Sequence, residues 1–127
     1  MNMKYFFLLL FIILFSSCNH KTKQASILFS NKELDFNTLI QGEEYEGEFI
    51  FLNTGDKPLY IEDVKADCGC SSLSFPENGI KPGDKGKIFL KYKSDSDVGN
   101  TTKVIVVKSN TTPKINTLYL VGNVVKP

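Results

Sequence analysis

Two cysteines separated by a single glycine are the residues of this chain whose types and spacing are best suited to chemistry. They are Cys68 and Cys70, and Asp67 directly precedes them. Thiolates are ligands for Cu(I) and zinc, and two neighbouring thiols can also form a disulfide that exchanges with other thiols. The pair therefore has three possible roles, which are structural, metal-binding and redox.

A structural role agrees with the spacing. In a straight strand the side chains of Cys68 and Cys70 would point to one face. Their Cα atoms would lie about 6.5 Å apart, at the long end of disulfide geometry. Gly69 permits a backbone bend that would bring the two side chains closer together. We interpret the pair first as structural, either bridged by a disulfide or kept as buried thiols.

Metal binding and thiol redox chemistry are alternatives that the residues leave open. A tetrahedral zinc site has four ligands, whereas the chain has three cysteines and one histidine, His20, close to the N-terminus. Only Asp67 is an obvious additional ligand, so a closed site would be shared between molecules. The usual redox motif has two residues between its cysteines, and no arginine or histidine stands beside this pair to lower a thiol pKa.

Other catalytic or binding chemistry is poorly supported. Because His20 is the only histidine, a catalytic triad with a histidine inside the fold cannot form. The formal net charge of +1 favours neither nucleic acid nor other polyanions as partners. We interpret the glutamates at 43, 44, 46 and 48 as the solvated face of a strand, and the lysines at 85, 87, 91 and 93 as solubilising side chains that protect a strand edge. We therefore expect no enzymatic activity, no cofactor and no nucleic-acid partner.

The N-terminal segment has the features of an export signal. Lys4 precedes an unbroken apolar run over residues 5–15, and Ser16-Ser17-Cys18 follows. This order is typical of a secretory signal, and the run is shorter than the roughly 20 residues that span a bilayer. The residues 14–18 resemble a bacterial lipobox, which makes Cys18 the expected site of lipid attachment. A short N-terminal membrane anchor is the alternative.

These features divide the chain into three expected segments. Residues 1–17 would be a lipoprotein signal peptide, residues 18–26 a polar tether, and residues 27–127 the folded domain. A lipid on Cys18 would hold the mature protein on a membrane of the bacterial cell envelope, facing the periplasm or the exterior.

The folded domain has the pattern of a β-sandwich. Tyr45, Phe49 and Phe51 alternate with charged residues, which is the period of a strand with one buried face. Similar short stretches recur between clusters of Gly, Pro, Asn and Asp, and no segment has helical periodicity. We expect about seven strands in an all-β, immunoglobulin-like sandwich, with the last strand, residues 115–125, interrupted at Gly122 and Asn123.

Several motifs in this order resemble the family DUF1573, over roughly residues 27–125. The resemblance implies an immunoglobulin-like fold and an exported or lipid-anchored bacterial protein of the Bacteroidetes type, and it brings no established activity. The motifs are Phe49-Ile50-Phe51-Leu52-Asn53-Thr54-Gly55, Leu59-Tyr60-Ile61, Asp67-Cys68-Gly69-Cys70, Lys81-Pro82-Gly83-Asp84, Ser109-Asn110 and Gly122.

The sequence thus predicts a non-catalytic, lipid-anchored β-sandwich module for protein interaction or scaffolding in the bacterial envelope. Its contacts would be the membrane, through the lipid on Cys18, and a protein partner. Strand addition at an exposed sheet edge is the expected mode of binding. The alternative function is a metal-binding or thiol redox protein that acts through Cys68 and Cys70.

Overall fold

The computed structural model describes residues 2–5, 22–67 and 70–127. Residues 3–5 form one helical turn, and the secondary structure of the remaining described residues is entirely β. No helix in these ranges is both long enough and apolar enough to cross a membrane. The expected signal peptide beyond residue 5 and the lipid site Cys18 lie outside the described residues.

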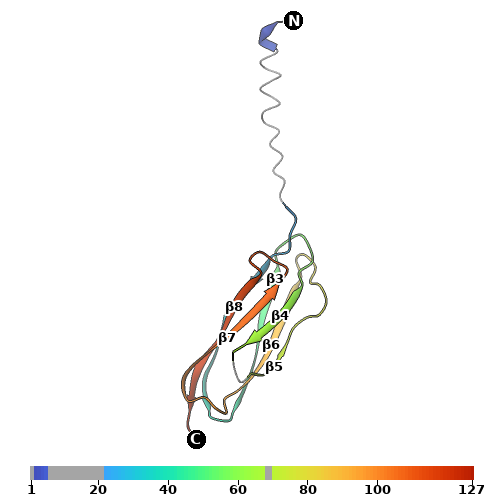
Figure 1. The fold of residues 1–127 in the computed structure, drawn as a ribbon. Coiled ribbons are helices and arrows are strands. Elements are labelled where there is room, and N and C mark those ends of the chain that lie inside the picture. The colour runs from blue at the N-terminus through green and yellow to red at the C-terminus, as the bar shows by residue number, and fades with distance from the viewer. Residues whose placement is uncertain (1, 6–21, 68–69) are drawn as a thin grey trace.

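Two four-stranded sheets pack face to face (Figure 1), which confirms the all-β, immunoglobulin-like sandwich. Eight strands are present instead of about seven. Sheet A has the order β1-β3-β6-β5, with β1 Ile27–Phe29, β3 Glu44–Asn53, β6 Lys85–Lys93 and β5 Cys70–Ser74. Sheet B has the order β2-β8-β7-β4, with β2 Glu33–Ile40, β8 Ile115–Val125, β7 Gly99–Ser109 and β4 Ile61–Ala66.

The chain passes from one sheet to the other five times. Each of the first four connections, from β1 to β5, crosses between the sheets, and so does the connection between β6 and β7. The β4–β5 connection contains the cysteine motif. The β2 strand pairs in parallel with β8, whereas the other strand pairs are antiparallel. Thus β2 and β8, which are the first and last strands of sheet B in sequence order, run in the same direction.

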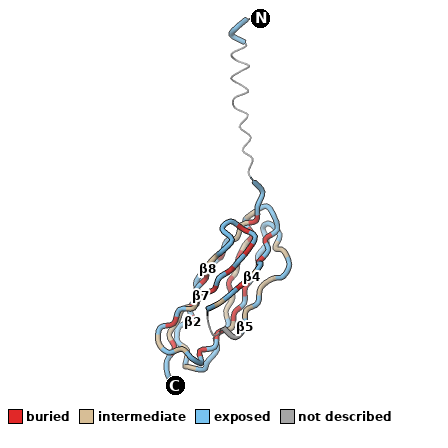
Figure 2. The backbone as a smooth tube through the Cα atoms, in the orientation of Figure 1, coloured by how far each residue is buried: buried red, intermediate tan, exposed pale blue. Residues whose placement is uncertain are grey.

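The core lies between the sheets, and buried residues alternate with more exposed ones along the strands (Figure 2). Sheet A contributes Phe49, Phe51 and Tyr92, and sheet B contributes Ile105 and Leu120, all of them almost completely buried. Burying one large apolar side chain stabilises the fold by roughly 1.5–3 kcal/mol. The period-two pattern of the sequence thus identified the inward face of β3 correctly.

The last strand, β8, continues through Gly122 and Asn123, so the expected interruption there is wrong. The side chain of Phe36 from β2 packs against the backbone of Gly122, where a Cβ would overlap its ring. Glycine at this position makes room for an aromatic ring of the neighbouring strand, and the strand does not need to end.

Asn53 explains why an Asn-Thr-Gly sequence ends β3. Its side chain is completely buried. Its Nδ2 donates hydrogen bonds to the carbonyl oxygens of Lys57 (2.8 Å) and Ile80 (2.9 Å), and its Oδ1 accepts one from the backbone N–H of Gly55 (2.9 Å). The backbone of Asn53 also exchanges hydrogen bonds with the turn at Gly83 and Asp84. Two of the family motifs therefore form one polar junction that joins three loops.

Different parts of the chain form hydrogen bonds at the two ends of the sandwich. At the end that we call proximal, the incoming residues Gln24 and Ser26 accept hydrogen bonds from the loop after β3. At the opposite end, called distal, the turn at Gln41 donates to Val125, close to the C-terminus. The described chain thus enters the sandwich at one end and leaves it at the other (Figure 1).

Candidate functional site

Two of the three cysteines fall outside what the structure describes. Cys18 and Cys68 lie in the undescribed ranges, and Cys70 is described only by its backbone, at the start of β5 opposite Tyr92. The lipid, disulfide, metal and redox roles of these cysteines therefore stay predictions. Within the described residues, no group of three or more His, Cys, Asp and Glu side chains could hold a metal ion.

Asp67, the expected helper of the cysteines, is engaged in the sheet. Its backbone N–H donates to the carbonyl oxygen of Val104 (3.2 Å), and its Oδ1 accepts from the backbone N–H of Val104 (2.8 Å). This reciprocal pair extends the β4–β7 ladder by one residue. Asp67 thus joins the end of β4 to β7.

The outer face of sheet A is a lattice of opposite charges. Lys87 lies 3.4 Å from Glu48, and Lys91 lies 3.0 Å from Glu46 across the β3–β6 pairing. The hydrogen bond with Glu46 raises the pKa of Lys91. Glu44, Glu46 and Glu48 thus lie on the solvated face of β3 as expected, whereas Glu43 lies in the turn before β3 and its Oε2 accepts from the backbone N–H of Ile40 (2.8 Å). The expectation that the lysines protect an edge is wrong, because β6 lies inside the sheet, between β3 and β5.

The outer face of sheet B is apolar at its centre. Val106, Ile115 and Tyr119 expose 36%, 49% and 40% of their surface, and the β7–β8 register brings them together with Val104. We call these four residues the apolar patch. The four successive apolar residues 104–107 of β7 alternate between the two sides of the sheet, so that Ile105 and Val107 lie in the core and Val104 and Val106 on this patch.

Acidic residues predominate along both margins of the apolar patch. On the β4 side, the Lys108–Glu62 (3.8 Å) and Lys65–Asp63 (3.6 Å) ion pairs lie beside Asp67. On the β2 side, Glu33 stands opposite Tyr119. The acidic residues of the two margins are Glu33, Asp35, Glu62, Asp63 and Asp67, against the basic residues Lys32, Lys65 and Lys108.

A polar groove lies beside this patch, at the distal end of sheet B. Its volume is about 460 Å³. A bulge between Asp35 and Thr38, with Asn37 in a left-handed conformation (φ 60°), exposes Asn37 and Thr38 next to each other. The side chains that line the groove around Val121 are Asp35, Asn37, Thr38, Asn100, Thr102 and Asn123.

The groove was missed by sequence reasoning. Asn100-Thr101-Thr102 reads as a polar loop, yet the residues belong to β7. The available signal was in β2, where Asn37 and Thr38 are successive polar residues inside a strand pattern. Such a pair breaks the alternation of a regular strand and is typical of a bulge.

A partly buried polar network stands at the same end, between the sheets. The Tyr92 hydroxyl donates to Asp97 Oδ2 (2.6 Å), and Lys103 Nζ donates to Asp97 Oδ1 (3.1 Å). The Tyr92 ring stacks on Phe36 with 5.3 Å between centroids. The hydrogen bond from Tyr92 lowers the pKa of Asp97, and burial together with Asp97 raises the pKa of Tyr92. Each polar group has a protein partner, so the network stabilises the fold.

The exposed edges of both sheets are short or irregular. The β1 strand has three residues, and bulges interrupt the pairing of β2, β4 and β5. Bulges and short strands are the means by which proteins discourage edge-to-edge pairing. The expected addition of a partner strand along an edge is therefore disfavoured relative to binding on a face.

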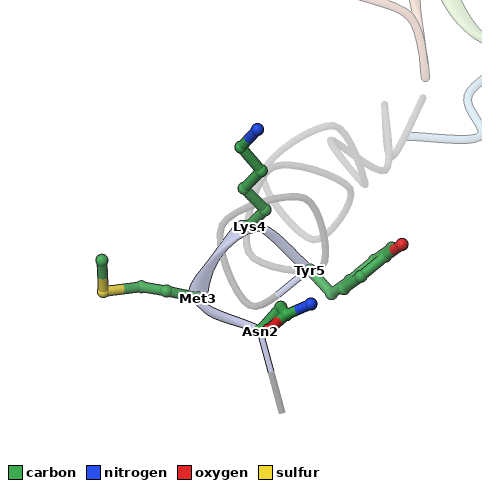
Figure 3. A pocket seen from close by; sticks show the side chains of 4 residues that line it. All are labelled: Asn2, Met3, Lys4 and Tyr5. Carbon is green, nitrogen blue, oxygen red and sulfur yellow. The ribbon is translucent and has the colours of Figure 1, made fainter.

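The N-terminal turn offers no site. The side chains of Asn2, Met3, Lys4 and Tyr5 diverge around a hollow of about 520 Å³ (Figure 3), and they do not converge on a common point. A binding site needs polar groups that converge on the ligand.

The two packed sheets, with an apolar core between them, define an immunoglobulin-like β-sandwich domain. This chain belongs to the DUF1573 family, described as "Protein of unknown function", whose model matches residues 27–124. The resemblance noted from the motifs is thereby confirmed. No curated protein matches the sequence.

Solved structures with this fold come from distant proteins. A protein of unknown function from Porphyromonas gingivalis W83 is 15% identical with a TM-score of 0.69, over 80% of this chain and 47% of that one. This chain thus spans about half of that protein. The ASH/PapD-like domain 7 of human CEP192 is 11% identical with a TM-score of 0.63, over 82% of this chain and 88% of that one.

A third similar structure is the secreted serine protease VesC from Vibrio cholerae, which is 10% identical with a TM-score of 0.58. The match covers 81% of this chain and 23% of the protease. At these identities the likeness shows the fold alone, since one fold carries many functions.

Proposed function

We propose that this protein is a non-catalytic interaction module of the bacterial cell envelope, held at a membrane by lipid on Cys18. The partner is a protein that binds the outer face of sheet B. The observation that carries this proposal is the difference between the two outer faces. Sheet A pairs its charges across β3 and β6, and its exposed apolar residues Leu28 and Phe89 lie on different strands beside these charges, whereas sheet B groups its exposed apolar residues in the apolar patch. Contiguous exposed apolar residues bordered by polar ones are typical of interaction sites.

The charges at the margins indicate the chemistry of the partner. Five acidic and three basic residues border the apolar patch. A complementary surface has an apolar centre and basic residues around it, because opposite potentials steer association and fix the orientation of the partner. Tyr119 is the expected anchor, since tyrosine combines a large apolar area with a polar tip.

Site-specific photocrosslinking of the full-length protein in cells tests this proposal. A photoreactive phenylalanine analogue replaces Tyr119 in one variant and Phe89 in a control variant. Phe89 is a matched control because it is an aromatic residue of the outer face of sheet A with 49% of its surface exposed. We expect a crosslinked protein with the Tyr119 variant and none with the Phe89 variant.

The crosslinked partner, identified by mass spectrometry, is then purified and titrated with the full-length protein. Val106→Lys is expected to weaken binding at least about tenfold, because it places a charge in the apolar patch. Equal crosslinking from both faces, or equal affinity of the Val106→Lys variant, would overturn the proposal.

A further inference from the structure

We propose that the polar groove at the distal end of sheet B binds a neutral saccharide. The first support is the arrangement of its side chains in rows across three strands. Thr38, Asn123 and Asn100 are register partners on β2, β8 and β7, and so are Asp35, Val121 and Thr102. Neighbouring strands lie about 4.8 Å apart. Each row therefore spaces its groups at the scale of substituents around one ring.

The second support is the hydrogen-bonding character of the groove. Three carboxamides and two hydroxyls are both donors and acceptors, and saccharide hydroxyls have the same dual character. Asp35 Oδ1 accepts from the backbone N–H of Asn37 (2.7 Å), which fixes the carboxylate at the rim. Within the described ranges, the side chains of Asn37, Thr38, Asn100, Thr102 and Asn123 make no hydrogen bond to another protein group. Their hydrogen-bonding capacity thus remains for a ligand.

The charge of the groove selects against other ligand classes. Asp35 is the only ionised group among the residues that line it. A phosphate or a sulfated polymer would meet a carboxylate and no cation, which is unfavourable. A hard divalent cation usually requires several carboxylates, and the groove supplies one. A neutral ligand with many hydroxyls is the class that remains.

The third support is an apolar floor that continues along β8. Val121 is the middle member of the second row, between Asp35 and Thr102. Tyr119 follows it on the same face of β8, about 7 Å away by strand geometry. The C–H face of a sugar ring is apolar while its edge carries the hydroxyls. One sugar ring can rest on Val121 with its edge among the asparagines. The next sugar ring can stack on the side chain of Tyr119, a residue that exposes 40% of its surface.

The bulge in β2 makes this arrangement. A regular strand would expose one of Asn37 and Thr38 and bury the other, whereas the bulge exposes both while Phe36 stays in the core. Since bulges are frequent next to binding sites as well as at sheet edges, the experiment must separate a ligand site from edge protection.

The test is a titration of the full-length, isotope-labelled protein in a sugar-free zwitterionic detergent, followed by amide NMR. The probes are cellotetraose, maltotetraose and the tetramer of N-acetylglucosamine, each to about 10 mM, which detects millimolar dissociation constants. We expect at least one probe to shift amide signals at residues 35–38, 100–102 and 121–123, with little change on the outer face of sheet A.

Two variants make the result specific. The double change Asn100→Ala with Asn123→Ala should weaken binding by about tenfold or more, since each removes hydrogen bonds to the ligand. Asn78→Ala, at an exposed loop asparagine, should leave binding unchanged. The proposal is overturned if none of the three saccharides shifts the groove signals, if shifts arise elsewhere, or if the double variant binds as well as the wild type. Tyr119 belongs to both surfaces, but the groove variants leave the apolar patch unchanged. Crosslinking from position 119 therefore tests protein binding separately from this proposal.

Discussion

Gly122 of β8 lies directly against the aromatic ring of Phe36 of β2, so that a Cβ at position 122 would overlap the ring. The same ring stacks on Tyr92 from the opposite sheet. The absence of a side chain at position 122 thus allows the Phe36–Tyr92 pair to pack at the distal end of the core.

Replacing this glycine should therefore destabilise the protein. We expect Gly122→Ala to lower the free energy of unfolding by about 1–3 kcal/mol, the usual cost of overpacking a core. Urea denaturation followed by circular dichroism measures the loss. The double variant with Phe36→Leu should lose less than the sum of the two single changes, because the smaller side chain gives the new methyl group room. Strict additivity would show that the ring and the glycine are not coupled.

Asn53 should be among the most sensitive polar positions. We expect Asn53→Ala to cost about 2–4 kcal/mol, because it leaves buried carbonyl oxygens of two loops without their donor. Asn53→Asp should be similarly damaging, since a carboxylate cannot donate to those carbonyl groups. Thermal denaturation of the full-length protein measures both. Asn78→Ala serves as the surface control and should change stability by less than about 0.5 kcal/mol.

Asp97 should make stability depend on pH in the acidic range. The hydrogen bond from Tyr92 lowers the folded-state pKa of Asp97, whereas in the unfolded chain this pKa is about 3.9. The stabilisation is therefore present above about pH 4, and it is lost as the pH falls below that value through the folded-state pKa.

Asp97→Asn should remove this contribution. We expect a loss of about 1 kcal/mol at pH 7, the scale of one partly exposed hydrogen bond, and convergence with the wild type towards pH 2. Urea titrations between pH 2 and 7 check this. Asp95→Asn, which breaks an exposed ion pair with Lys93, should have a smaller effect. A wild-type to Asp97→Asn difference that stays constant with pH would contradict the assignment.

Cys18 should decide whether the protein stays in the membrane fraction. Each buried lipid methylene contributes about 0.8 kcal/mol of membrane affinity, so Cys18→Ala should release the protein and abolish labelling by a fatty-acid analogue. Cys68→Ala is the matched control and should remain membrane-bound. If Cys18→Ala also stays in the membrane and wild type takes up no label, a short N-terminal anchor explains the attachment instead.

The fold class could be predicted from the sequence because local residue patterns indicate where strands and turns occur. Alternation in β3 and turn residues around Lys81 and Gly83 place strands and loops without reference to the rest of the chain. The continuity of β8 through Gly122 was not predictable in this way, because it depends on Phe36, a residue 86 positions earlier. The position of β6 inside sheet A likewise depends on strand order. This position places the lysines of β6 on the face of the sheet and not at its edge.

The sites were less predictable than the fold. The cysteine pair attracts attention by residue type, yet it lies largely outside the described residues. The polar groove combines β2, β7 and β8, and its asparagines are ordinary turn residues when considered singly. Only the register of three strands brings Thr38, Asn123 and Asn100 into one row. A site of this kind depends on pairing over a long sequence separation, which a local pattern cannot indicate.

The parallel pairing of β2 with β8 also determines how the domain responds to mechanical tension. A pull between the proximal entry and the distal C-terminus draws these strands in opposite directions along their length. The hydrogen bonds between them are then loaded together in shear and do not open one after another. A protein tethered at its entry point, with a load applied at its far end, would resist extension along its longest axis.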